Sequence, residues 1–226
     1  MTGGDEVLRR AARYAACGPA QMPLLRRAMD LLLQEAPARS CTRVLPCRAE
    51  AGGARIGGRR VEGEALFRAL EGFPRAVLAC ATLGQAADRL LARAQVQDMA
   101  LALALDACAS ALVEEAALSA LRGAAAGACT GEATAPGYAG FPLEGQQALL
   151  DLVDARRRLG VARTRAGMLA PAKTLLYVQG LHPGAPADPD AAPGRVGPPC
   201  AACPRTDCPF RRAERNEHDK SEETTC

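Results

Sequence analysis

The sequence predicts an α+β protein, in which helices and short strands follow one another in irregular order. Three observations favour this class: segments with helical periodicity, short apolar runs typical of strands, and no repeated strand–helix alternation. The 226 residues amount to about one to one and a half domains and can bury a core without disulfides or metals. Sequence signatures of dinucleotide- and phosphate-binding loops, the G-x-S-x-G elbow and the HExxH zinc site are absent.

The first half of the chain combines helical periodicity with strand signals. Helices are expected over residues 6–17, 21–35 and 63–70. Strands are expected over residues 42–47, 54–56 and 76–83, the first two forming a hairpin around a glycine-bearing turn. In the second helix, Met29 and its neighbouring leucines recur at helical spacing before Pro37. The third strand is a continuous apolar run that ends at Gly84, which indicates a buried strand turning into a helix.

The second half is dominated by a long helical region. Helices are expected over residues 85–122 and 143–158, strands over 161–165 and 174–179, and a loop over 123–138. A break in the long helix is expected near Gln95. Asp106, Ser110 and Glu114 stand four residues apart and form a polar line along that helix. The line indicates either a face directed at a cofactor or an ordinary solvated face.

The domain organisation follows from a change in composition near the C-terminus. One domain is expected over residues 1–182, a linker over 183–199, a cysteine cluster over 200–212 and a disordered charged tail over 213–226. The linker is rich in Pro, Gly, Ala and Asp, a composition that does not form a core of its own.

The charge and the apolar pattern exclude several classes of partner. The net charge of +3 comes from 28 basic and 25 acidic residues that are mixed along the chain, which argues against nucleic acid as a partner. No apolar run approaches the ~20 residues that a membrane span needs, so no membrane partner is expected. The N-terminus lacks the features of a signal peptide. These observations predict a cytoplasmic protein whose cysteines are thiols or ligands rather than disulfides.

The ten cysteines fall into two populations. Isolated cysteines with mostly apolar neighbours are expected to be small buried hydrophobes: Cys17, Cys41, Cys47, Cys80, Cys108 and Cys129. Cys200, Cys203 and Cys208 instead follow one another at x2 and x4 spacing, which suits an iron–sulfur cluster or a zinc ion. A zinc site would need a fourth ligand from Cys226, His218 or His182. A redox-active thiol set, or no ligand role, stays open for this cluster.

Four short motifs occur in an order that is specific to one family. They are the ATLG of residues 81–84, the Ala94-Gln95 and Asp98-Met99 pairs, the APGY of residues 135–138 with FPLE at 141–144, and the C-terminal C-x2-C-x4-C-P-F-R. Together they resemble the vitamin B12-dependent methionine synthase activation (reactivation) domain, in its small stand-alone form with a C-terminal cysteine cluster. The resemblance extends from about residue 6 to residue 212.

The resemblance implies both a fold and an activity. The implied fold is a curved, largely antiparallel sheet flanked by long helices. The implied protein is a methyltransferase component that serves a cobalamin-dependent methyltransferase and reactivates oxidised cob(II)alamin by reductive methylation from S-adenosylmethionine. The implied partner is a corrinoid protein, or a methionine synthase lacking its own activation domain, which supplies the cobalamin. An electron donor such as flavodoxin completes the implied system.

The resemblance also places a ligand site at one turn. Ala135, Pro136, Gly137 and Tyr138 are the implied residues for binding S-adenosylmethionine or corrin. The glycine allows close approach of the backbone, and the tyrosine combines an apolar ring with a polar tip. Taken without the family, the same Pro-Gly-Tyr sequence is typical of an ordinary type II turn.

The sequence departs from the family pattern beside this turn. Ala133 stands where relatives carry an arginine for the ligand carboxylate, and Gly140 stands where the small relatives often carry an acid. Either Arg122 or Arg165 takes the arginine's role, or the site is degenerate. The alternative function is therefore a non-catalytic docking or scaffold protein for a corrinoid protein, and a third is a metal-tailed domain with an unrelated partner.

Overall fold

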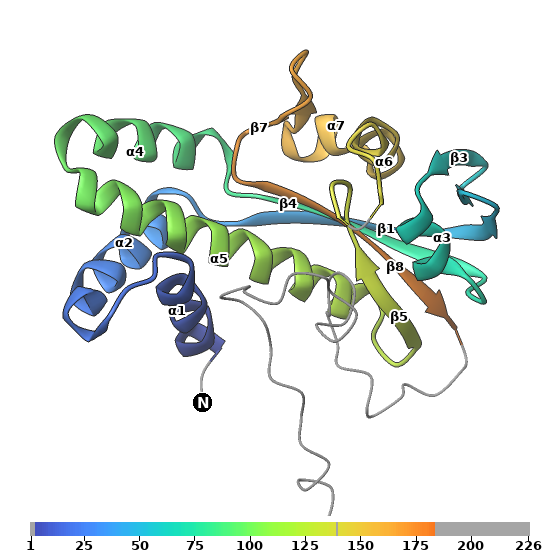
Figure 1. Cartoon of the computed structure of the whole chain (residues 1–226), viewed down its shortest axis with the longest axis horizontal. Helices are drawn as coiled ribbons and strands as arrows, with labels where there is room; N and C mark the ends of the chain where they lie inside the picture. The colour runs from blue at the N-terminus through green and yellow to red at the C-terminus, as the bar shows by residue number, and fades with distance from the viewer. Residues whose placement is uncertain (1–2, 139, 184–226) are drawn as a thin grey trace, which may run out of the picture.

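The computed structural model of the chain describes residues 3–138 and 140–183 (Figure 1). The helices are α1 (Gly3–Tyr14), α2 (Met22–Glu35), α3 (Glu64–Leu70), α4 (Gly84–Gln97), α5 (Met99–Ala124), α6 (Gly145–Val153) and α7 (Ala155–Leu159), with a 3-10 turn over Pro19–Gln21. The strands are β1 (Arg39–Glu50), β2 (Gly53–Ile56), β3 (Arg59–Glu62), β4 (Arg75–Thr82), β5 (Cys129–Thr134), β6 (Ala162–Arg163), β7 (Leu169–Ala170) and β8 (Thr174–His182).

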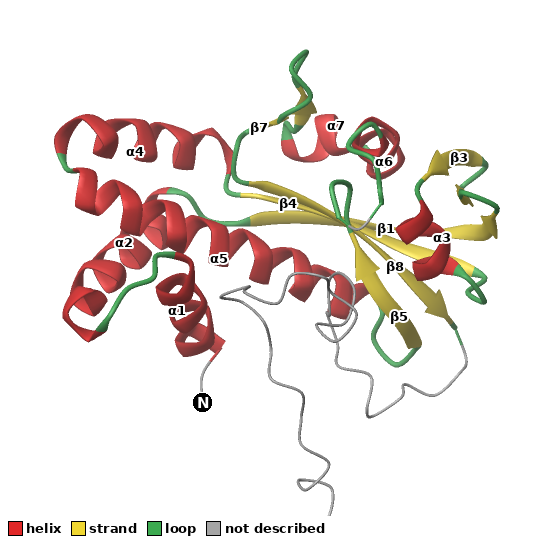
Figure 2. Ribbon diagram, in the orientation of Figure 1, coloured by secondary structure: helices red, strands yellow, loops and turns green. Residues whose placement is uncertain are grey.

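One antiparallel sheet carries the fold. Its strand order is β3-β2-β1-β4-β8-β5, and β6 pairs with β7 separately. Figure 2 shows helices on both faces of this sheet, so the central strand β4 is buried along all but its first residue. The predicted class, an α+β protein with a largely antiparallel sheet flanked by long helices, is confirmed.

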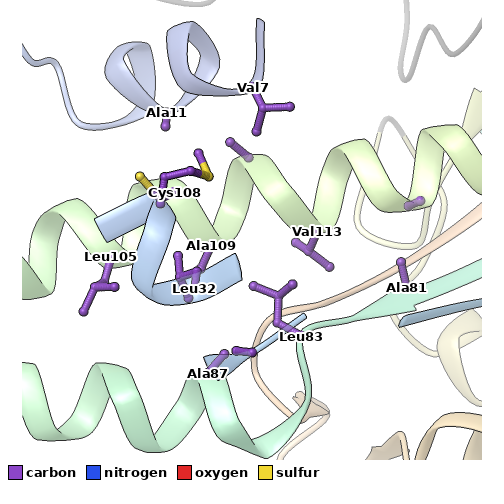
Figure 3. Packing of buried hydrophobic residues seen from close by; sticks show 14 of the residues in the cluster. Val7, Ala11, Leu32, Ala81, Leu83, Ala87, Leu105, Cys108, Ala109 and Val113 are labelled. Atoms are coloured by element: carbon purple, nitrogen blue, oxygen red, sulfur yellow. The ribbon is translucent and has the colours of Figure 1, made fainter. Parts of the chain in front are cut away.

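Side chains of β4 alternate between two hydrophobic clusters, because successive residues of a strand point to opposite faces. Val77, Ala79 and Ala81 pack with residues of α1, α2, α4 and α5. Leu78 and Cys80 pack with residues of α3, α6 and α7. Figure 3 shows part of the first cluster, with α5 lying between α1 and α4. The long helix α5 is therefore the element that ties the N-terminal helices to the sheet.

The break in the long helical region lies at Asp98, three residues beyond the expected position near Gln95. The Asp98 carboxylate accepts a hydrogen bond from the backbone N–H of Leu101 at 3.0 Å, which satisfies one of the free donors at the start of α5. The cap favours a new helix from Met99 onward, and α4 ends at Gln97.

Other expected elements differ from the observed ones. Residues 129–134, expected within a loop, form edge strand β5, since the neighbouring β8 supplies hydrogen-bond partners to a segment with weak strand propensity. The helix expected over 143–158 divides at Asp154, which adopts a left-handed conformation (φ 54°). The strand expected over 161–165 has only two residues, and the expected hairpin has a third strand, β3.

The isolated cysteines divide by burial. Cys41, Cys80 and Cys108 are buried, as predicted, whereas Cys17, Cys47 and Cys129 are only half-buried. Burial raises the pKa of the Cys80 and Cys108 thiols to about 12. These two thiols are therefore protonated at neutral pH and serve as small apolar side chains.

Part of the predicted organisation lies outside the described residues: the linker after Pro183, the cluster of Cys200, Cys203 and Cys208, and the tail over 213–226. In the part that the structure describes, no helix combines the length and the apolar character that a bilayer span requires.

Candidate functional site

A cavity of about 340 Å³ lies where α1, α5, the turn after β5 and the start of β8 meet. Its lining residues are Tyr14, Ser110, Val113, Glu114, Tyr138, Ala172, Lys173, Thr174, Leu175 and Tyr177. All three tyrosines of the chain are among them. We call this the tyrosine cavity. Because the chain is poor in aromatic residues (3%), the gathering of every tyrosine at one place marks the cavity as the candidate site.

Glu114 is the acidic group of the tyrosine cavity. The Tyr14 hydroxyl donates a hydrogen bond to Glu114 Oε2, and Arg10 Nη1 lies 3.6 Å from the same oxygen. Burial, and after it the charge of Glu114, raises the pKa of Tyr14, Tyr138 and Tyr177 above the ordinary value of 10.0. The three phenols therefore stay protonated at neutral pH. Tyr14 donates its proton to Glu114, whereas the hydroxyls of Tyr138 and Tyr177 can donate to a ligand.

Lys173 is the basic group that lines the same cavity. Its Nζ donates to Ser110 Oγ at 2.9 Å and to the backbone carbonyl of Asp106 at 3.3 Å. It also lies 2.8 Å from Asp106 Oδ1. The polar line of α5 is thus divided: Ser110 and Glu114 line the cavity, whereas the Asp106 side chain is 61% exposed. The cavity accordingly presents a carboxylate and an ammonium group on neighbouring parts of its surface.

The end of β4 fixes the backbone that carries Lys173. The backbone N–H of Leu83 donates to the Lys173 carbonyl at 3.0 Å, and the Thr82 hydroxyl donates to it at 3.3 Å. The Thr174 hydroxyl lies 2.8 Å from Thr82 Oγ1, and both side chains are buried. On the other side, the carboxylate of Asp88 in α4 accepts from the N–H of Ala172 at 3.2 Å. The ATLG motif therefore has a structural role in positioning Lys173.

The predicted ligand turn supplies one lining residue and the geometry that holds it. Tyr138 lines the cavity and is 47% exposed, while Ala135, Pro136 and Gly137 form the turn before it. The Gly137 N–H donates to the carbonyl of Phe141 at 2.7 Å. Gly137 has φ +97°, and a Cβ there would lie 3.2 Å from the Leu143 side chain. The glycine is thus required by the backbone conformation and by Leu143.

The position that departs from the family pattern lies in the core. Ala133 in β5 is fully buried, opposite Gln179 of β8. Neither arginine proposed to substitute at the site lines the tyrosine cavity: Arg122 pairs with Glu115, and Arg165 is exposed in the turn between β6 and β7. The cationic side chain that does line it is Lys173.

Sequence reasoning missed Tyr14, Lys173 and Tyr177 as site residues, and Tyr14 stands far in the chain from the other two. The rarity of tyrosine and lysine could have indicated these residues, because the sequence holds three tyrosines in all and its only lysines are Lys173 and Lys220. In a chain whose other basic residues are arginines, a lysine within the domain is informative.

A second, more open cavity of about 500 Å³ lies at the far ends of β1 and β8 and is lined in part by Cys47, Phe73 and His182. The Cys47 thiol donates to the Phe73 carbonyl at 3.3 Å, and burial raises its pKa to about 11. This thiol is therefore not a ready nucleophile at neutral pH. Among the described residues, no group of three or more His, Cys, Asp or Glu side chains could hold a metal ion.

Comparison with known proteins finds a similar solved structure but no match to a family model and no significant match to a curated protein. A solved structure described as the MetH reactivation domain bound to AdoHcy is similar with a TM-score of 0.60 and 14% sequence identity. The similarity covers 80% of this chain and 77% of the other. The chain therefore has the fold of the MetH reactivation domain.

Proposed function

We propose that the tyrosine cavity binds S-adenosylmethionine and that the chain reactivates the oxidised cobalamin of a partner methyltransferase. The observation that supports this most is the convergence of all three tyrosines with Glu114 and Lys173 in one cavity. That cavity lies on the fold of a domain whose solved structure holds AdoHcy, the demethylated product of this donor.

The lining residues fit such a ligand in size and chemistry. A volume of about 340 Å³ is within the ~300–1,000 Å³ of small-molecule sites. Aromatic faces attract cations such as a sulfonium, and the negative Glu114 adds to this attraction. The protonated phenols of Tyr138 and Tyr177 supply hydrogen bonds that can orient polar groups of the ligand.

The reaction balances only with components from outside this chain. One electron from a donor such as flavodoxin converts cob(II)alamin to cob(I)alamin, which takes the methyl group of the sulfonium and leaves S-adenosylhomocysteine. The corrin would come from a corrinoid protein or from a methionine synthase lacking its own activation domain. On this proposal the residues of the tyrosine cavity bind and orient the methyl donor, and limit the access of water to it.

One observation favours the alternative of a docking protein with a degenerate ligand site. Ala133 provides no cation, and its side chain is fully buried in the same hydrophobic cluster as residues of α5. An arginine introduced at this position would overpack the core rather than restore a contact. Restoration by Ala133→Arg is therefore a poor test, and variants of the cavity itself are preferable.

Isothermal titration calorimetry with S-adenosylmethionine and S-adenosylhomocysteine tests the proposal directly. The native chain should bind both, and Glu114→Gln should weaken binding of both about tenfold or more because a charged contact is lost. Arg93→Gln is the matched control, since Arg93 pairs with Glu35 on the surface and does not line the cavity. Absence of binding by the native chain would favour the docking alternative.

Reactivation itself needs a second assay with a corrinoid partner. In the presence of an electron donor and S-adenosylmethionine, the native chain should accelerate the conversion of the partner's cob(II)alamin to methylcobalamin, which absorbance spectra follow. Glu114→Gln should slow this conversion and Arg93→Gln should not. Equal rates with and without the chain would contradict the proposed activity.

A further inference from the structure

Two contacts with α5 hold the Lys173 ammonium group at the cavity, and a ligand anion can replace its third partner. Its side chain is 16% exposed, and Ser110 Oγ and the Asp106 carbonyl accept from its ammonium group. These two acceptors belong to α5 and keep the ammonium group in place. The remaining partner is the Asp106 carboxylate, which is 61% exposed. An ion pair with so exposed a partner contributes little stability, so a ligand anion could replace it at small cost.

The neighbouring acidic group makes the cavity complementary to a zwitterion. Ser110, which holds the ammonium group of Lys173, precedes Glu114 by one helical turn, or about 6 Å along α5. A group with a carboxylate and an ammonium close together matches this arrangement with one charge toward each residue. The amino-acid end of a ligand has this pattern, whereas a nucleoside alone does not.

We propose that Lys173 binds the carboxylate of the ligand's amino-acid end and thereby selects ligands that carry one. This inference rests on the proposed function, because it assigns one contact to the ligand proposed for the tyrosine cavity. The contacts of Leu83, Thr82 and Asp88 with residues 172–173 hold the lysine backbone in position before a ligand arrives. Preorganisation of this kind reduces the entropy that binding must overcome.

Calorimetry with a pair of ligands isolates the contact. S-adenosylmethionine and decarboxylated S-adenosylmethionine share the sulfonium, the adenosine and the amine and differ in the carboxylate alone. The native chain should bind the first about tenfold to a hundredfold more tightly. Lys173→Met should remove that preference by weakening S-adenosylmethionine, with little change for the decarboxylated form.

Two further variants complete the test: one should strengthen S-adenosylmethionine binding, and the other is a control. Asp106→Asn removes the competing carboxylate and should strengthen S-adenosylmethionine binding by up to about fivefold. Arg165→Met removes one exposed positive charge that does not line the cavity and should leave the preference unchanged. The ligand pair on the native chain and the surface change Asp106→Asn keep the proposal testable even if Lys173→Met is poorly folded.

The outcomes separate this inference from the proposed function. Equal affinity of the native chain for the two ligands, or a preference that survives in Lys173→Met, overturns the role of Lys173 while S-adenosylmethionine binding stands. Loss of the preference in Arg165→Met assigns the carboxylate to that arginine and likewise overturns it. A native chain that binds neither ligand overturns both proposals.

Discussion

Raising the pH from about 8 to about 10 should lower the free energy of unfolding through the thiols of Cys80 and Cys108. Both side chains are fully buried, and burial raises the pKa of each thiol from 9.0 to about 12. The folded state therefore keeps these protons at a pH where the unfolded chain has lost them. The resulting stabilisation is complete below pH 9.0 and is lost progressively as the pH rises toward about 12.

The magnitude follows from the two pKa values. A thiol with a pKa of 9.0 in the unfolded chain and about 12 in the folded chain lowers the free energy of unfolding at about pH 10 by about 1.4 kcal/mol. Two such thiols together lower it by about 3 kcal/mol. This loss is measurable against the free energy of unfolding of a typical domain, ~5–15 kcal/mol.

Urea unfolding at the two pH values, in the presence of a reductant, measures this loss. Cys80→Ala and Cys108→Ala should each reduce the pH-dependent loss by about 1.4 kcal/mol, whatever their effect at pH 8. Val77→Ala is the control, because it truncates a buried residue of the same strand without removing a thiol. A pH-dependent loss that is the same in the native chain and in both cysteine variants would refute the reasoning.

Three further predictions concern the site, its turn and the C-terminal cysteines. Tyr14→Phe should weaken S-adenosylmethionine binding about tenfold in calorimetry, because it removes the hydrogen bond that orients Glu114. Gly137→Ala should destabilise the fold by about 1–3 kcal/mol in thermal unfolding, because φ is positive there. Gly123→Ala in α5, where a Cβ would meet nothing within 4 Å, should instead stabilise it. Protein purified without oxygen should contain iron with sulfide, or zinc, and lose it in Cys203→Ser; metal-free native protein would contradict this.

The sequence predicted the elements whose signals are local. The helix expected over 21–35 is α2, and the strand expected over 76–83 is β4 shifted by one residue, since periodicity and a continuous apolar run need no partner to be recognised. Strand β5 was missed because its pairing with β8 is irregular between Thr130 and Ala133 and because it contains Gly131. Such an edge strand forms only when a distant strand offers its backbone.

The site was predictable only in part, for the same physical reason. Tyr138 belongs to a short motif, and Ser110 and Glu114 share one face of one helix, so their relation is visible in the sequence. Tyr14 and Lys173 reach the cavity from elements far apart in the chain, and tertiary packing alone brings them together. Their pairing with α5 therefore could not be inferred from spacing.

The alanine content of α5 connects the packing of the core to the geometry of the site. Its buried alanines include Ala109, Ala111 and Ala117, whose small side chains let the neighbouring elements lie close to the helix. The same closeness places Ser110 Oγ 2.9 Å from Lys173 Nζ across the cavity. A larger side chain at any of these fully buried positions would shift α5 relative to its neighbours and disturb that contact, since overpacking a core moves the backbone. The alanine content of α5 thus determines how closely the helix packs. It thereby also determines how far Glu114 and Ser110, on the helix side of the cavity, lie from Lys173 on its strand side.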